Sequence, residues 1–313
     1  MVKKTRDDSQ KEGVKYYHQM LAGCLVHPDR DCVIPFAPEP INKQDGNNKN
    51  DSERPALRRF LDRLRADHPK LPLILTADAL HSNGPLIRDL KLYNIDYILS
   101  VKPGSHIKLF EGIDKWEERG KLKYFTFEEE IGDKIKKKRI HQFRYTNNIL
   151  FNHLNIDLSV NFIEYWETTQ WVSAKGELQE KKIHFSWITN FEITEKNIMQ
   201  LMRGGRARWK IENETFDTLK NHGYEFEHNF GHGEKNLTNV FAYLMFLAFL
   251  FDQLQQIGCK TFQRTLKYCK RKSYMWEDLR SLFRISYTFK KVFESWTEFL
   301  EHAIGPPKRS ETS

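Results

Sequence analysis

Two short apolar runs separated by a helical segment constrain the fold of this chain more than any other feature. Residues 71–76 and 95–101 are mostly Leu, Ile and Val, and both runs are too short to be typical helices. Each predicts a buried strand. Residues 53–67 and 86–92 carry apolar side chains at helical spacing and predict helices. This alternation of strands and helices predicts an α/β core.

The rest of the chain falls into segments of other kinds. Residues 14–28 and 32–37 predict two extended segments joined by a turn. Residues 103–190 contain aromatic-rich alternating stretches between charge runs, and they predict a β-rich insertion. From residue 194 onward the pattern is helical. The apolar run 241–251 is too short to span a bilayer and predicts a fully buried core helix.

Charge and cysteine content narrow the class of partner and the compartment. A net charge of +8 predicts a polyanionic partner, and nucleic acid is the usual one. The four cysteines show no Cys-x-x-Cys spacing, which argues for a reducing compartment and against a disulfide or zinc framework. The first ten residues lack the apolar segment of a secretory signal.

Two carboxylates stand where functional groups are often found. Asp78 directly follows the first apolar run, and the carboxyl ends of strands are where α/β proteins place functional groups. Glu212 follows Arg208 by four residues in a predicted helix, so the two side chains share a face. An adjacent arginine keeps a carboxylate ionised and oriented, as metal binding requires. Two such carboxylates, with a third from an earlier strand, can hold two divalent metal ions.

Each of these features also has a plainer interpretation. Asp78 can cap the turn that follows it, and Arg208 with Glu212 can form an ordinary surface salt bridge. Trp166 and Trp171 can stack on an unpaired base or belong to the core of a sheet. Basic clusters can contact phosphates or form a solvated face. The largest cluster lies in the β-rich segment and comprises Lys134, Lys136, Lys137, Lys138, Arg139 and Arg144.

Arg208-Trp-Lys-Ile-Glu212 is followed by helix to Lys220, and Leu73-Ile-Leu-Thr-Ala-Asp78 is followed by Asn83-Gly-Pro85. On these motifs the chain resembles the bacterial DDE transposases of the insertion-sequence-four type. The first motif is similar to the family's tyrosine–arginine–glutamate–lysine signature, and the second to its second-aspartate strand. Residues 17–21 and 45–53 also resemble family segments, so the resemblance covers about residues 14–255.

The resemblance implies a fold and a division into parts. The fold class is α/β, an RNase H-like core with a β-rich insertion before the final glutamate and a helical C-terminal part. Residues 1–102 would be a partial core, 103–190 the insertion, 191–304 the helical completion of the core with the C-terminal helices, and 305–313 a flexible tail. The first core strand is expected to be missing.

The resemblance also implies a chemistry. Asp78 and Glu212 would be catalytic ligands of Mg²⁺ or Mn²⁺ in hydrolysis and strand transfer at transposon ends. The DNA-binding residues would be Arg208, Lys220, Arg206 and Lys210. The expected partners are DNA, both transposon ends and target, and a second copy or a full-length transposase, with no membrane. The expected location is the bacterial cytoplasm, in association with the nucleoid.

Three departures from the family pattern bear on activity. The tyrosine of the signature falls at Gly205, and Lys220 comes one residue later than usual, which leaves Glu214 as a lesser candidate for the last carboxylate. Only 13 residues precede the segment 14–28, so the first aspartate and its strand are expected to be missing from an N-terminally truncated chain. The predicted function is a DNA transposase in an inactive or impaired form. The alternative is a non-catalytic remnant that binds DNA or a transposase as an inhibitor.

Overall fold

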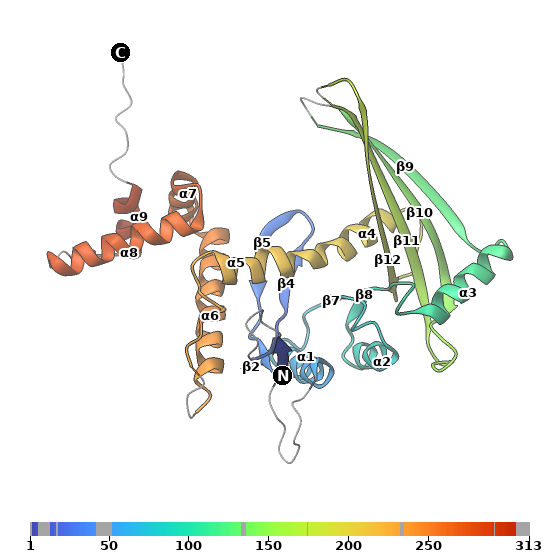
Figure 1. The fold of residues 1–313 in the computed structure, drawn as a ribbon, viewed down its shortest axis with the longest axis horizontal. Helices are drawn as coiled ribbons and strands as arrows, with labels where there is room; N and C mark the ends of the chain where they lie inside the picture. The colour runs from blue at the N-terminus through green and yellow to red at the C-terminus, as the bar shows by residue number, and fades with distance from the viewer. Residues whose placement is uncertain are drawn as a thin grey trace. The chain divides into compact units, whose positions relative to one another are not determined.

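A six-stranded mixed sheet and several helices make up most of the described chain (Figure 1). The computed structural model describes residues 2–5, 13–16, 18–41, 52–132, 136–173, 175–231, 235–290 and 292–304. It divides into two compact units. One comprises Leu61–Arg208, and the other comprises Met1–Phe60 together with Trp209–Ser313. Helix α1 (Glu53–Asp67) has the bounds that the sequence predicts, and the unit boundary falls within it.

The sheet belongs to the unit 61–208, and its strand order among the described residues is β7-β8-β12-β11-β10-β9. Strands β7 (Ile74–Ala77) and β8 (Asp96–Ser100) are parallel and are connected through helix α2 (Gly84–Leu92). All other pairs are antiparallel. The predicted α/β class is therefore confirmed as a mixed α/β arrangement. The remaining strands are β9 (Lys123–Ile131), β10 (Lys137–Leu150), β11 (Ser159–Val172) and β12 (Leu178–Thr189).

The β-rich segment continues the same sheet. Strand β12 pairs with β8 through Trp187 opposite Ser100. The long strands β11, β10 and β9 come next in the sheet and are drawn in shades of green in Figure 1. Buried aromatic side chains of β10, β11 and β12 pack with the residues that precede and begin helix α4 (Ile198–Arg206). Strand β9 falls in the segment 103–190 that was predicted to be β-rich. Helix α3 (Ile107–Glu118) lies in the same segment and was not predicted, because charged residues interrupt its apolar pattern.

Strand β7 is not the buried strand that its composition predicts. Ile74 is 51% exposed, and β7 lies at one edge of the sheet in the described residues. Strand β8, with neighbours on both sides, carries the buried residues Tyr97, Ile98 and Leu99. An apolar run therefore identified a strand correctly but not its place in the sheet, because burial depends on what pairs and packs with it.

The second unit is built on a hairpin and helices. Strands β4 (Cys24–His27) and β5 (Arg30–Pro35) form the predicted hairpin. The single extended segment predicted over 14–28 is wrong, because it is divided into short strands. Of these strands, β2 (Gly13–Tyr16) pairs with β1 (Val2–Thr5), β3 (Met20–Leu21) pairs with β6 (Glu39–Pro40), and β4 belongs to the hairpin. The C-terminal helices α7 (Lys260–Cys269), α8 (Lys272–Thr288) and α9 (Trp296–Ile304) share a small core of their own.

Helix α6 (Leu237–Gly258) contains the apolar run but is not fully buried. One side of the helix packs through Phe246 and Phe249 against Val33 of β5. The other side exposes Leu244 by 53% and Phe251 by 58%, so the prediction of a fully buried helix is wrong. In the described part of the chain, α6 is the one helix that is long and apolar enough to cross a membrane. The test uses length and composition only, and core helices of soluble proteins also pass it.

Helix α4 approaches the sheet more closely than side chains would allow. A Cβ atom on Gly205 would lie 2.6 Å from ring atoms of Trp187, and one on Gly204 would lie 2.9 Å from Cδ1 of Ile98. Trp187 and Ile98 are almost fully buried. The position at which the family resemblance places a tyrosine therefore has no room for any side chain.

We predict that Gly205→Ala destabilises the protein, because the new methyl group must displace the buried indole of Trp187. Overpacking of this kind costs about 1–3 kcal/mol. Gly112→Ala is the matched control, since Gly112 is also helical and its Cβ would lie 3.7 Å from Ile149, an ordinary contact. The control should be neutral or gain up to about 1 kcal/mol of helix propensity. Chemical unfolding measures both, and an equal effect of the two substitutions would contradict the packing argument.

Candidate active site

Asp78 lies at the carboxyl end of the parallel strand pair. It follows the last residue of β7 and is exposed. Its Oδ1 accepts a hydrogen bond of 3.1 Å from the backbone N–H of Leu80, so the side chain caps its own turn. A carboxylate has two oxygens and several lone pairs, so the same side chain can also serve a cation.

The loop after Asp78 is tied to the end of the neighbouring strand. Ser82 is buried, and its Oγ donates a 2.5 Å hydrogen bond to the carbonyl of Ser100, the last residue of β8. The ring Nε2 of His106 lies 2.8 Å from the carbonyl oxygen of Ser82. These contacts hold Asp78 at the carboxyl end of the strands, where α/β proteins place functional groups.

Glu212 lies on an irregular helical segment. The helix predicted over 194–221 is interrupted by a 3-10 turn, η1 (Ala207–Trp209), and a π-helix, η2 (Ile211–Phe216), before α5 (Asp217–Asn221). The shared face inferred for Arg208 and Glu212 assumed regular α-helical spacing, and on this interrupted helix it stays a prediction. Glu212 is exposed on the π-helix, and π-helical turns are frequent at functional sites.

Lys210 has an internal role in its unit. It is 3% exposed, its Nζ donates a short hydrogen bond to the carbonyl of Arg30, and it lies 3.5 Å from Oδ1 of Asp31. The ammonium therefore ties the segment before the π-helix to the turn of the β4–β5 hairpin. Its predicted contact with DNA phosphate stays a prediction that this geometry does not favour.

Lys220 and Arg206 are more accessible. The side chain of Lys220 is 40% exposed and pairs with Glu227 at 2.7 Å. Arg206 pairs with Glu167 at 2.7 Å and lies over the ring of Phe185. The exposed ion pair of Lys220 contributes little to stability, so this cation can exchange its carboxylate for a phosphate, whereas Arg206 is paired with the buried Glu167.

Glu167 shows how strongly Arg206 is coupled to the sheet. Burial alone would raise the pKa of the Glu167 carboxyl. The hydrogen bond from Tyr165 and the charges of Arg206 and Arg139 outweigh burial, and the pKa is lowered. Glu167 is therefore held ionised beneath the end of α4.

The basic cluster of the β-rich segment is largely neutralised by the neighbouring strand. Lys138 pairs with Glu128 at 2.8 Å and Arg139 with Glu129 at 3.2 Å. Arg144 lies between Glu117 and the buried Glu164. Antiparallel pairing of β9 with β10 brings Lys138 and Arg139 beside these glutamates, whereas the two partners of Arg144 lie on α3 and β11. Lys134 of the predicted cluster lies outside the described residues.

The two tryptophans of the sheet already have local partners. The ring of Trp166 stacks on His184 with a centroid distance of 5.2 Å, and the guanidinium of Arg144 lies 5.8 Å from its centre. The ammonium of Lys137 lies 5.2 Å from the ring centre of Trp171. Both tryptophans are half-buried, so stacking on an unpaired base stays a prediction.

The described residues contain no group of three or more His, Cys, Asp or Glu side chains that could hold a metal ion. Asp78 belongs to the unit 61–208, whereas Glu212 belongs to the other unit. Each is an exposed carboxylate with the hard oxygen donors that Mg²⁺ prefers. Their use in one site therefore remains a prediction from the sequence motifs.

The buried carboxyl group of Asp252, on helix α6, was not predicted. Asp252 is 6% exposed and accepts a short hydrogen bond from the hydroxyl of Tyr224. Burial raises the pKa of Asp252 to about 6. Burial also lowers the pKa of Lys272, although the charges of Asp252 and Glu214 act in the opposite direction. In the sequence, Asp252 directly follows the apolar run 241–251, and its position as the one charged residue within α6 was the available signal.

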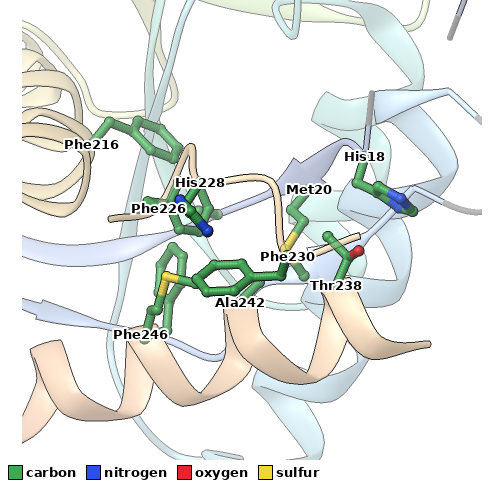
Figure 2. A pocket seen from close by; sticks show the side chains of 11 residues that line it. His18, Met20, Phe216, Phe226, His228, Phe230, Thr238, Ala242 and Phe246 are labelled. Atoms are coloured by element: carbon green, nitrogen blue, oxygen red, sulfur yellow. The ribbon is translucent and has the colours of Figure 1, made fainter. Parts of the chain in front are cut away.

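An apolar pocket lies beside α6 in the same unit (Figure 2). The aromatic side chains of Phe226 and Phe230 form part of its wall. The lining also includes two histidines, His18 and His228. The ring of Phe230 lies over the helix near Ala242 in this view. Neither Asp78 nor Glu212 lines the pocket, so it is separate from the predicted acidic residues.

A family model described as Transposase DDE domain matches residues 3–250. The match includes Asp78, Glu212 and all four predicted DNA-binding residues, and it ends within α6. No curated protein matches the chain.

Asp252 predicts a pH dependence of stability. Its pKa is raised in the folded state, so the folded protein binds the proton more tightly, and stability falls as pH rises from about 4 to about 6. Asp252→Asn keeps a hydrogen-bonding group without the charge and should flatten that part of the curve. Urea unfolding from pH 4 to 7 measures the difference between the two proteins. A constant difference across this range would exclude a shifted Asp252.

Proposed function

The chain belongs to the DDE transposase family, and we propose that it acts in DNA transposition by metal-dependent phosphoryl transfer at transposon ends. The observation that carries this proposal is the family match over residues 3–250. DDE transposases act on DNA and generally use divalent metal ions. The net charge of +8 agrees with a polyanionic substrate.

Within the family, we propose the insertion-sequence-four type with an RNase H-like core. The parallel β7–α2–β8 unit supports this assignment, as does the position of the antiparallel strands before the segment that carries Glu212. The proposed parts are those predicted from the sequence: a core segment over 1–102, a β-rich insertion over 103–190, helices over 191–304 and a tail over 305–313. The proposed location is the cytoplasm, in association with the bacterial nucleoid.

We propose Asp78 and Glu212 as ligands of Mg²⁺ or Mn²⁺. A bound metal ion of this kind activates the attacking oxygen and stabilises the leaving oxygen of the phosphodiester. The Leu80 N–H and the Ser82–Ser100 bond keep the Asp78 carboxylate at the strand end. The proposed contacts with DNA phosphates are made by three cations in or beside the motif that contains Glu212: Arg208, Lys220 and Arg206. For Lys210, burial supports a role in holding the helical segment.

The activity of the chain is a separate proposal. The family motifs assign residues to two of the three carboxylates and leave the first aspartate without a residue. Losing a ligand of a two-metal site removes most catalysis, so we propose an inactive or impaired enzyme. The same observation favours a second candidate function, an inhibitor that binds DNA or a transposase without cleaving.

The metal ligands can be tested by Asp78→Ala, Glu212→Ala and Glu214→Ala, with Asp114→Ala in α3 as an exposed control. We expect the first two to weaken Mn²⁺ binding at least about 10-fold, as loss of metal-site groups does, and Glu214→Ala and the control to leave it unchanged. Electron paramagnetic resonance measures binding, and nicking of duplex DNA with Mn²⁺ measures cleavage.

The outcomes separate the two candidate functions. Cleavage by the unsubstituted chain that is lost in Asp78→Ala and Glu212→Ala supports the enzyme. DNA binding without any cleavage supports the inhibitor. Equal Mn²⁺ affinity in all variants would remove the assigned metal site.

The DNA contacts can be tested by comparing Arg208→Ala and Lys220→Ala with Lys210→Met. Loss of one phosphate contact should reduce the slope of log affinity against log salt by about 1, with little change in stability. Lys210→Met should leave the slope unchanged and lower stability by about 1.5–3 kcal/mol, because it removes a buried charged hydrogen bond. Fluorescence anisotropy across salt concentrations and urea unfolding give the two quantities. A reduced slope without destabilisation in Lys210→Met would reverse the assignment.

A further inference from the structure

A chain of hydrogen bonds runs across the sheet to the end of helix α4. The hydroxyl of Tyr165 donates a 2.8 Å hydrogen bond to Oε2 of Glu167. Nδ1 of His141 lies 2.7 Å from the same hydroxyl oxygen, and Nε2 of His141 lies 3.2 Å from Oε1 of Glu129. Glu167 in turn accepts a 2.7 Å hydrogen bond from Arg206, the last residue of α4. These side chains form one continuous path from β9 to α4, within a single compact unit.

The middle of this path is buried among the aromatic side chains of the sheet. Tyr165 is 0% exposed, His141 is 3% exposed and Glu167 is 7% exposed. The ring centroid of Tyr165 lies 4.8 Å from that of Phe143. Burying polar groups costs free energy, and well-packed apolar side chains of similar volume are often as stable as a buried polar network. Stability alone therefore gives no reason for a polar path at this place, whereas a need to fix the side chain at its end does.

The Tyr165 hydroxyl controls how the Glu167 carboxylate is oriented. A hydroxyl has one proton to donate and two lone pairs that accept. A ring N–H of His141 can bind one lone pair, which leaves the proton directed at Glu167. Burial raises the pKa of Tyr165, and the hydrogen bond and charge of Glu167 raise it further, so the hydroxyl keeps its proton. The carboxylate is thereby held from the side opposite to Arg206.

Arg206 is held by two contacts and still has donors to offer. One terminal nitrogen donates to Glu167, and the guanidinium carbon lies 5.6 Å from the ring centre of Phe185. A guanidinium has five N–H donors, so these contacts leave most of them available. The side chain of Arg206 is 35% exposed. A planar guanidinium fixed in this way can bind a phosphate without first leaving its carboxylate.

We propose that Tyr165 and His141 are positioning residues that fix the guanidinium of Arg206 for contact with a DNA phosphate. The inference rests on the proposed function, because it takes Arg206 to be a DNA contact. It goes further by giving two buried side chains a role in that contact. Both act through Glu167, so their loss changes the affinity for DNA only while Arg206 is present.

Tyr165→Phe tests the path, because it keeps the ring in the core and removes only the hydroxyl. We expect it to lower the affinity for duplex DNA about 3- to 10-fold, the value of one hydrogen bond, and to reduce the slope of log affinity against log salt. Tyr145→Phe is the matched control, because Tyr145 belongs to the same buried aromatic cluster but not to the hydrogen-bonded path. It should change neither quantity in fluorescence anisotropy.

A double-mutant cycle with Arg206→Ala separates positioning from a general structural effect. If Tyr165 acts through Arg206, Tyr165→Phe lowers the affinity of the unsubstituted chain and has no further effect in Arg206→Ala. His141→Gln is a second variant that leaves the Tyr165 hydroxyl in place. It should show the same dependence on Arg206 with a smaller loss, because His141 lies one step further along the path. Circular dichroism verifies that each variant keeps its fold.

A measurement without DNA distinguishes failure of this inference from failure of the proposed function. In a chain with isotope-labelled arginine, nuclear magnetic resonance measures the rotation of the Arg206 guanidinium, whose signal is identified by its loss in Arg206→Ala. Rotation should be hindered in the unsubstituted chain and in Tyr145→Phe, and faster in Tyr165→Phe.

Two results would overturn the inference. One is guanidinium rotation that is equally hindered in Tyr165→Phe and in the unsubstituted chain. The other is a loss of DNA affinity in Tyr165→Phe that is the same with and without Arg206. A chain that binds no duplex DNA at any salt concentration would instead contradict the proposed function and the phosphate contact with it. The rotation measurement would then still decide whether Tyr165 positions Arg206.

Discussion

The close contact between helix α4 and the sheet depends on two adjacent glycines. Gly205 lies so near Trp187 that a single methyl group would overlap the indole, and Gly204 is similarly close to Ile98. Close packing of this kind permits little adjustment. The chain that leaves α4 continues into the 3-10 turn and the π-helix that carries Glu212. The same contact explains why this chain has no tyrosine at the corresponding position of the family signature.

Ion pairing determines how much of the basic charge remains available to a nucleic acid. The glutamates of β9 lie opposite the basic residues of β10, and Glu167 holds Arg206. The exposed pairs between β9 and β10 are weak and can be exchanged, whereas the Glu167 carboxylate is buried. Lys210 differs, because its ammonium is buried and bonded to a backbone carbonyl. The net charge of +8 therefore predicts the class of partner without locating the surface that binds it.

Several elements could be predicted because their determinants are local. Helix α1 follows from its amphipathic spacing, and the β4–β5 hairpin follows from two short runs around a turn. The place of Asp78 after a strand was equally visible. Helix α3 was missed because charged residues interrupt its apolar pattern within a segment that was predicted to be β-rich. The π-helix was missed because its hydrogen-bond pattern leaves no periodic signal in six residues.

The sequence by itself determined the α/β class and the family motifs, because these depend on local order along the chain. It is also the source of the prediction that Asp78 and Glu212 are site residues. The tertiary structure alone decided which apolar surfaces are covered. Strand β7 is at a sheet edge despite its buried composition, and α6 is covered on one side only. It also placed Lys210 inside and left Glu212 exposed. Burial and ion pairing arise between residues distant in sequence, so no local pattern could have specified them.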